Sequence, residues 1–150
     1  MTLYGAVVLV HVMAAVVGLG PAFIFPILFR FSKTKEQMLW INALMAAIEK
    51  VVIVGSLTLL ATGLFMGMLH PYLFSTGWYI ASIALYVLAQ VLVIGIAGKN
   101  AQMAATLLEQ SEGTSIPEEV LLLNKKADAA LLYANGIAIV MIILMVTKPF

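Results

Sequence analysis

The sequence contains no cysteine, and charged side chains make up only 10% of its 150 residues. Without thiols the chain forms no disulfide, binds no iron–sulfur cluster and performs no thiol chemistry. The charged fraction is less than half of the about 25% that soluble domains usually carry. The net charge is +1, so nothing favours a nucleic-acid partner, whereas 63% of the residues are apolar. This composition points to one small domain in a membrane.

Four apolar runs are long enough to cross a bilayer, which takes about 20 helical residues. They are Leu3–Phe29, Val51–Leu69, Trp78–Gly98 and Ala129–Thr147. The first run exceeds the ~7–15-residue core of a signal peptide and its basic residues follow it, so we interpret it as a retained helix. The predicted fold is all-α: a single four-span transmembrane helical bundle over residues 1–150.

Basic residues are spread unevenly over the connections between these runs. Seven of the eight lie between the first and second or between the third and fourth runs, namely Arg30, Lys33, Lys35, Lys50, Lys99, Lys125 and Lys126. The positive-inside rule therefore places these two connections in the cytoplasm and both termini outside. We expect a multi-pass protein of a bacterial cytoplasmic membrane.

The segments next to the basic connections have mixed polarity, so helices are expected to extend into the cytoplasm through Glu36–Glu49 and Asn100–Gln110. Ser115 and Glu118 have the spacing of a capping box that would start the fourth helix early. An outer aromatic belt is expected at Tyr4, Tyr72, Trp78 and Tyr79, with Trp40 at the inner face.

A few polar side chains interrupt the apolar runs and are the candidates for a functional site. At 1.5 Å per residue, His11 lies ~12 Å below the outer surface, at about the depth of Thr62 and Tyr86. A second set falls near the midplane: Ser56, Thr58, Gln90 and Asn135. Polar groups in hydrocarbon require partners, so we expect these side chains to turn inward and form two polar layers.

His11 shares its helical face with small residues, Ala14, Ala15 and Gly18. Such a face allows two interpretations. One is close helix packing, with His11 donating a hydrogen bond to Tyr86 or Thr62. The other is space for a flat ligand, haem b, with His11 as its axial ligand. The haem pocket would then be lined by Thr62, Tyr86, Gln90 and Asn135.

The other candidate ligands lie at the end of the second run. His70 precedes Pro71 and differs from His11 in depth by ~12 Å. Met66 is one turn nearer to His11, and Met/His ligation is a known haem arrangement. The candidate metal ligands are therefore His11, Met66 and His70. An alternative is a small-solute or metal transporter that uses Met66, Met68 and His70 near the outer face.

Glycine and proline carry two further predictions. Gly63 and Gly67 form a GxxxG pair, which predicts close contact with a neighbouring helix. Pro21 and Pro26 each remove a helical hydrogen bond, so a kink is expected in the first run. The carbonyl groups that they free are those of Val17 and Ala22.

Two motifs carry a family resemblance: His11-Val-Met-Ala-Ala-Val-Val-Gly18-Leu-Gly-Pro21 in the first run and Thr62-Gly63-Leu64 in the second. In these motifs and in its layout, the chain resembles small bacterial four-helix membrane proteins of the DUF2269 type, a family of unknown function. More distantly, it is similar to CopD-like copper-resistance domains and to HemJ-type protoporphyrinogen oxidases. The latter resemblance implies haem binding through His11 and a lysine on the third span, where this chain has only Lys99 at the inner end.

Two classes of function follow. The first is a b-type haem-binding or redox-accessory protein with His11 as axial ligand. The second is a non-enzymatic membrane subunit or assembly partner, in which the polar layers fix the helix register. Its partners would be the lipid bilayer, other membrane subunits or a second copy of the chain. The sequence has no phosphate loop, HExxH motif or GxSxG elbow that would identify catalytic residues.

Overall fold

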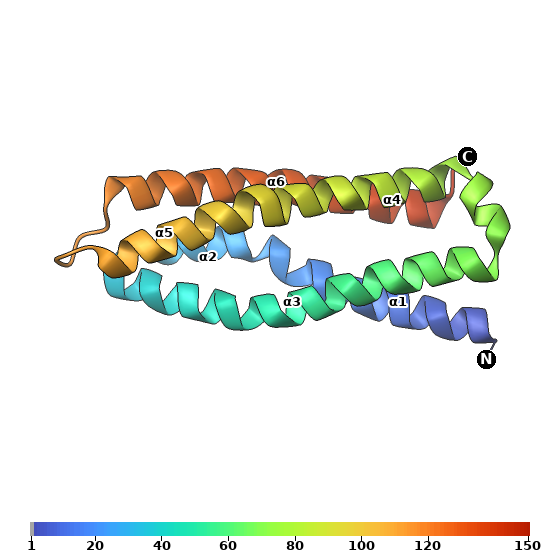
Figure 1. The fold of residues 1–150 in the computed structure, drawn as a ribbon, viewed down its shortest axis with the longest axis horizontal. Coiled ribbons are helices and arrows are strands. Elements are labelled where there is room, and N and C mark those ends of the chain that lie inside the picture. Colours follow the sequence, from blue (N-terminus) through green and yellow to red (C-terminus); the bar gives the residue numbers. More distant parts are fainter. Residues whose placement is uncertain (1) are drawn as a thin grey trace.

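Four long helical stretches lie side by side in the structure, a computed structural model that describes residues 2–150 (Figure 1). In chain order the elements are α1 (Leu3–Leu19), the 3-10 turn η1 (Gly20–Phe23), α2 (Phe25–Phe31), α3 (Lys35–Leu69), the 3-10 turn η2 (Pro71–Ser75), α4 (Gly77–Gln90), the π-helix η3 (Val91–Gly98), α5 (Lys99–Gln110) and α6 (Glu118–Thr147). Residues 2–150 contain no strand. The predicted all-α fold is confirmed.

Four helical stretches are long and apolar enough to cross a membrane: Leu3–Phe29, Lys35–Leu69, Gly77–Gln110 and Glu118–Thr147. α3 alone has 35 residues and is therefore ~52 Å long at 1.5 Å per residue. The hydrocarbon core of a bilayer is only about 30 Å thick. The helices consequently project beyond the hydrocarbon, as the polarity of the sequence predicts.

The helices associate as two pairs. α1 packs chiefly along α3, whereas α4, η3 and α5 pack along α6. Both termini and the turn η2 lie at one end of the bundle, which we call the terminal end (Figure 1). The opposite end carries residues 32–34 and 111–117, and we call it the loop end. Buried apolar clusters follow the long axis, centred on Leu59 and Tyr86, on Phe25 and Leu131, and on Leu108 and Val120.

The two proline-containing boundaries behave differently from each other. The first span is interrupted as predicted, because α1 ends at Leu19 and η1 and α2 each begin next to a proline. The fourth helix starts early, as predicted, because α6 begins at Glu118. The expected capping box at Ser115 is wrong: Pro117 stands at the N-cap and no side chain caps the helix. The physical reason is that a proline ring clashes with the backbone of the residue before it and disfavours the helical conformation of that residue. Ile116 therefore cannot open the helix.

Candidate functional site

His11 lies between α1 and α3 and is only 9% exposed. Its Nδ1 is 2.9 Å from Oγ1 of Thr62. The Thr62 hydroxyl donates its proton to the carbonyl of Thr58, 2.6 Å away, so it accepts a hydrogen bond from His11. In a neutral imidazole whose Nδ1 carries the proton, Nε2 is the acceptor nitrogen. The predicted hydrogen bond from His11 to Thr62 is present.

The small-residue face beside His11 is filled by α3. A Cβ atom on Gly18 would lie 2.8 Å from the carbonyl carbon of Gly55, and one on Gly55 would lie 2.6 Å from the Gly18 nitrogen. Neither distance leaves room for a side chain, so the two backbones are in direct contact. Ala14, one turn from Gly18, is buried in the cluster that contains Leu59 of α3. This face therefore serves close helix packing.

The GxxxG pair makes the predicted close contacts with neighbouring helices, and it makes them through side chains. A Cβ on Gly63 would lie 3.3 Å from Cε1 of His11. Gly67 faces the hydroxyl of Tyr79 and the ring of Phe74. These glycines admit side chains from neighbouring elements, because the missing Cβ leaves a hollow that a ring fills. A direct contact between helix backbones occurs elsewhere, at Gly18 and Gly55.

A second polar group joins the two helix pairs near the middle of the bundle. The Tyr86 hydroxyl donates to the backbone carbonyl of Ser56 at 2.8 Å and is 2.7 Å from the Ser56 hydroxyl. The Gln90 amide donates to the same Ser56 hydroxyl at 2.7 Å. Since the proton of Tyr86 goes to the carbonyl, Ser56 must donate to Tyr86. Each group thus donates to the next: the Gln90 amide to the Ser56 hydroxyl, that hydroxyl to the Tyr86 hydroxyl, and the Tyr86 hydroxyl to the backbone carbonyl of Ser56 in α3.

The remaining predicted midplane residues do not join this group. Asn135 of α6 donates to the carbonyl of Ala22 at 3.0 Å. That carbonyl is the acceptor that Pro26 leaves without its helical partner, as predicted. Thr58 is half-buried and donates to the carbonyl of Val54 in its own helix. The four predicted pocket residues therefore separate: Thr62 contacts His11, Tyr86 and Gln90 contact Ser56, and Asn135 contacts the kink.

Sequence reasoning missed one buried residue of this region. Tyr79, expected in the aromatic belt, is 6% exposed and donates from its hydroxyl to the carbonyl of Gly63 at 2.9 Å. The available signal was its position seven residues before Tyr86, which places both rings on one face of the helix.

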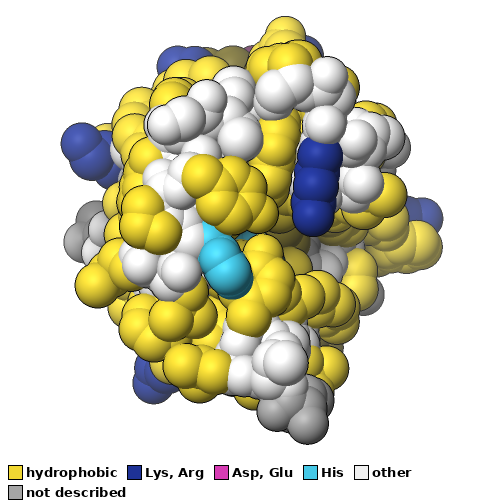
Figure 2. All heavy atoms as spheres, turned by 90° about the vertical axis from the view of Figure 1, so that its right-hand side faces the viewer, with side chains coloured by type: hydrophobic (Ala, Val, Ile, Leu, Met, Phe, Trp, Pro, Cys, Tyr) yellow, Lys and Arg dark blue, Asp and Glu magenta, His cyan; other side chains and the backbone are white. Residues whose placement is uncertain are grey.

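The candidate metal ligands lie at different levels. The His70 ring packs edge-on against Tyr4 and Tyr72, with centroids 4.6 and 5.9 Å apart. His70 follows Thr62, the partner of His11, by eight residues and thus by ~12 Å of helix. Figure 2, which faces the terminal end, shows a histidine side chain at the surface among apolar side chains.

The two histidines have different neighbours, Thr62 for His11 and the rings of Tyr4 and Tyr72 for His70. Met66 is half-buried, whereas Met68 is 69% exposed on the side of the helix that faces outward. Within residues 2–150, no three histidine, aspartate or glutamate side chains gather where they could hold a metal ion. His70 thus lies two turns of α3 beyond Thr62, the partner of His11, whereas Met66 lies one turn beyond it.

Comparison with known proteins gives one match. A family model described as "Predicted integral membrane protein (DUF2269)" matches residues 5–149. No curated protein and no solved structure matches the chain.

Proposed function

The chain belongs to the DUF2269 family of predicted integral membrane proteins, and we propose that it serves there as a non-enzymatic membrane subunit or assembly partner. The main observation in favour of this role is the direct backbone contact of Gly18 with Gly55. This contact fills the face of α1 on which a planar cofactor beside His11 would have to lie. Its place would be a bacterial cytoplasmic membrane, with both termini outside, because seven of the eight basic residues lie between the first and second or between the third and fourth predicted spans.

The hydrogen bonds of the buried polar side chains support this role. His11 and Thr62 join α1 to α3, Tyr79 and Tyr86 join α4 to α3, and Asn135 joins α6 to the kink. Each bond connects two different spans. In a membrane such bonds fix which residues of neighbouring helices lie opposite one another. The polar residues thus act on the bundle itself.

One observation favours a second candidate, a b-type haem protein. Thr62 is hydrogen-bonded to Nδ1 of His11, and histidine ligands of metals commonly have their second nitrogen bonded in this way. His11 and Thr62 are therefore suited to supply an axial nitrogen ligand to haem iron. They do not suit the plane of a porphyrin, because α3 occupies the small-residue face. We therefore rank haem binding second.

Absorption spectroscopy separates the two candidates. The protein would be purified in mild detergent from haem-replete cells, and reduced-minus-oxidised spectra recorded for wild type, His11→Ala and His70→Ala before and after titration with haemin. We expect no Soret or α band in any sample. Light scattering on the same samples should show a particle larger than one chain with its detergent.

Two results would overturn the subunit proposal. Haem bands in wild type and His70→Ala that disappear in His11→Ala would assign His11 to haem. A single chain in native lipid discs, with neither a second copy nor another protein, would contradict a role as a subunit.

A further inference from the structure

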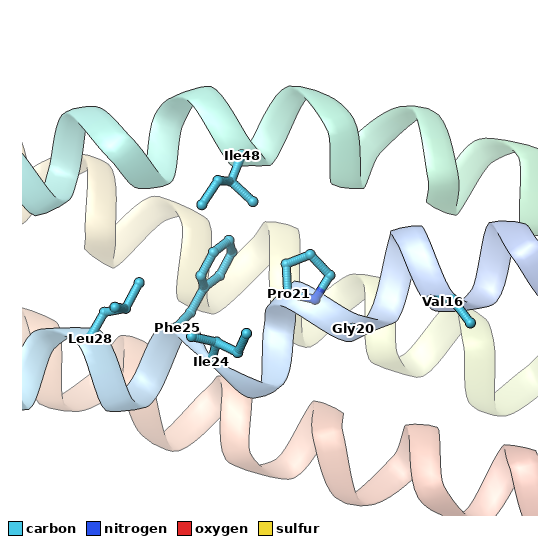
Figure 3. Close-up of a pocket in the computed structure, with 7 residues that line it drawn as sticks. All are labelled: Val16, Gly20, Pro21, Ile24, Phe25, Leu28 and Ile48. Carbon is cyan, nitrogen blue, oxygen red and sulfur yellow. The ribbon is translucent and has the colours of Figure 1, made fainter.

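The kink in the first span leaves an apolar groove of about 420 Å³ on the side of the bundle. Val16, Gly20, Pro21, Ile24, Phe25 and Leu28 line one side, and Ile48 of α3 lines the other. Figure 3 shows Ile48 extending from α3 toward the Phe25 ring, with the proline ring beside them. Val16 and Ile24 are 69% and 54% exposed. The groove is therefore open to the surroundings of the bundle.

The groove has a definite structural origin. At Gly18 and Gly55 the first span and α3 touch with their backbones. Immediately beyond this crossing, Pro21 and Pro26 break the span into η1 and α2, which removes the regular packing of one helix along the other. The space between α2 and α3 therefore results from the two prolines that follow the glycine crossing.

A second hollow of about 350 Å³ follows along the same pair of elements toward the loop end. It is lined by Phe31 of α2 and by Glu36, Gln37, Trp40 and Ile41 of α3. Ile41 precedes Ile48 by seven residues and therefore shares its face of α3. The lining thus changes along one line of contact, from wholly apolar side chains to a tryptophan with polar neighbours.

An apolar groove followed by a partly polar hollow is the arrangement that would bind an amphiphilic molecule of the membrane. The groove lies in a membrane-spanning stretch and offers only apolar side chains, so its occupant there is a hydrocarbon. The hydrocarbon that surrounds a membrane-spanning stretch is the acyl chains of the lipid. We therefore take a single acyl chain as the occupant.

Positive charge near the loop end favours a lipid with an anionic headgroup. The segment of residues 30–35, which follows the groove, contains Arg30, Lys33 and Lys35 and no acidic residue. The Lys35 ammonium group donates to the Ser111 carbonyl, so Lys33 is the basic residue of the connection itself. Basic residues next to a span attract anionic lipid headgroups. We propose that an anionic phospholipid binds here, with one acyl chain in the groove between α2 and α3 and its phosphate at the 30–35 connection. This inference does not depend on the proposed subunit role.

Native mass spectrometry tests the proposal on the full-length chain. The protein would be released from mixed micelles that hold equal amounts of dioleoylphosphatidylglycerol and dioleoylphosphatidylcholine. We expect wild type to retain one phosphatidylglycerol. Val16→Phe, which fills the groove, should retain several-fold less, whereas Val54→Phe introduces the same ring at an exposed position of α3 and should behave like wild type.

A second matched pair guards against misfolding of one variant. Gly20→Leu fills the groove from its floor, and Gly136→Leu is its control, because a Cβ at either glycine meets no atom within 4 Å. Lys33→Gln should reduce the preference for phosphatidylglycerol over phosphatidylcholine. Equal retention by the groove variants and their controls would overturn the proposal. So would equal retention of both lipids by wild type, or a two-chain species lost only in the groove variants, which would make the groove a contact between copies.

Discussion

Tyr79 and Tyr86 are two turns apart on α4, and the α3 carbonyl groups that they reach, those of Gly63 and Ser56, are two turns apart in the opposite direction. The same spacing on antiparallel helices means that one register satisfies both bonds. Sliding α4 along α3 by one turn would break both bonds at once. The two tyrosines therefore fix how the α1–α3 pair sits against the α4–α6 pair.

Removing the Tyr86 hydroxyl should destabilise the bundle measurably. Hydrogen bonds between membrane helices contribute on average about 0.6 kcal/mol and at most about 1.7 kcal/mol. We expect Tyr86→Phe to lie at the upper end of this range, since the Ser56 hydroxyl loses its acceptor as well, and Tyr79→Phe to lie nearer the average. Reversible unfolding in detergent measures both. Tyr133→Phe, at a 70% exposed ring, is the control, and equal stability of all three variants would refute the assignment.

Gly18→Ala should be among the most harmful small substitutions in the chain. Its Cβ would lie 2.8 Å from the Gly55 carbonyl carbon, so the helices must move apart, and overpacking of this kind costs about 1–3 kcal/mol. Gly136→Ala meets nothing within 4 Å and should instead stabilise α6 by roughly 0.5–1 kcal/mol through its helix propensity. Thermal unfolding of the two variants should therefore shift in opposite directions. Shifts of the same sign would contradict the backbone contact.

Asn135 should matter only while Pro26 is present. Asn135→Ala leaves the Ala22 carbonyl without a donor, at a cost of about 1 kcal/mol. Pro26→Ala supplies a backbone N–H that can bond to the same carbonyl. In the Pro26→Ala background we therefore expect Asn135→Ala to cost clearly less, which a double-mutant cycle of unfolding free energies measures. An unchanged cost would show that Asn135 acts elsewhere.

The absence of cysteine allows the orientation to be tested with single substitutions. Ser75 lies in η2 at the terminal end and Ser115 lies in the loop-end connection, and both are exposed. With both termini outside, a membrane-impermeant maleimide should label Ser75→Cys in intact cells and Ser115→Cys only after the cells are opened. Labelling in the reverse order would invert the proposed topology. The unsubstituted chain, which has no thiol, gives the background.

Several features of the fold could be predicted because they depend on the local sequence. Span length, the kink at Pro21 and Pro26, and the inward position of His11 depend on hydropathy and on the chemistry of proline, which are local. The partners of Asn135 and Tyr79 could not be predicted, because both are backbone carbonyls, and a carbonyl is present at every residue. Spacing alone likewise could not show that Gly63 admits an imidazole.

Both ends of the chain lie at the terminal end of the bundle, together with the η2 turn (Figure 1). In a membrane crossed by the four helices they would emerge at one face. A linker between the last residue of one copy and the first residue of another would then never have to pass through lipid. Tandem fusion of two copies in one reading frame would accordingly give both halves the same orientation.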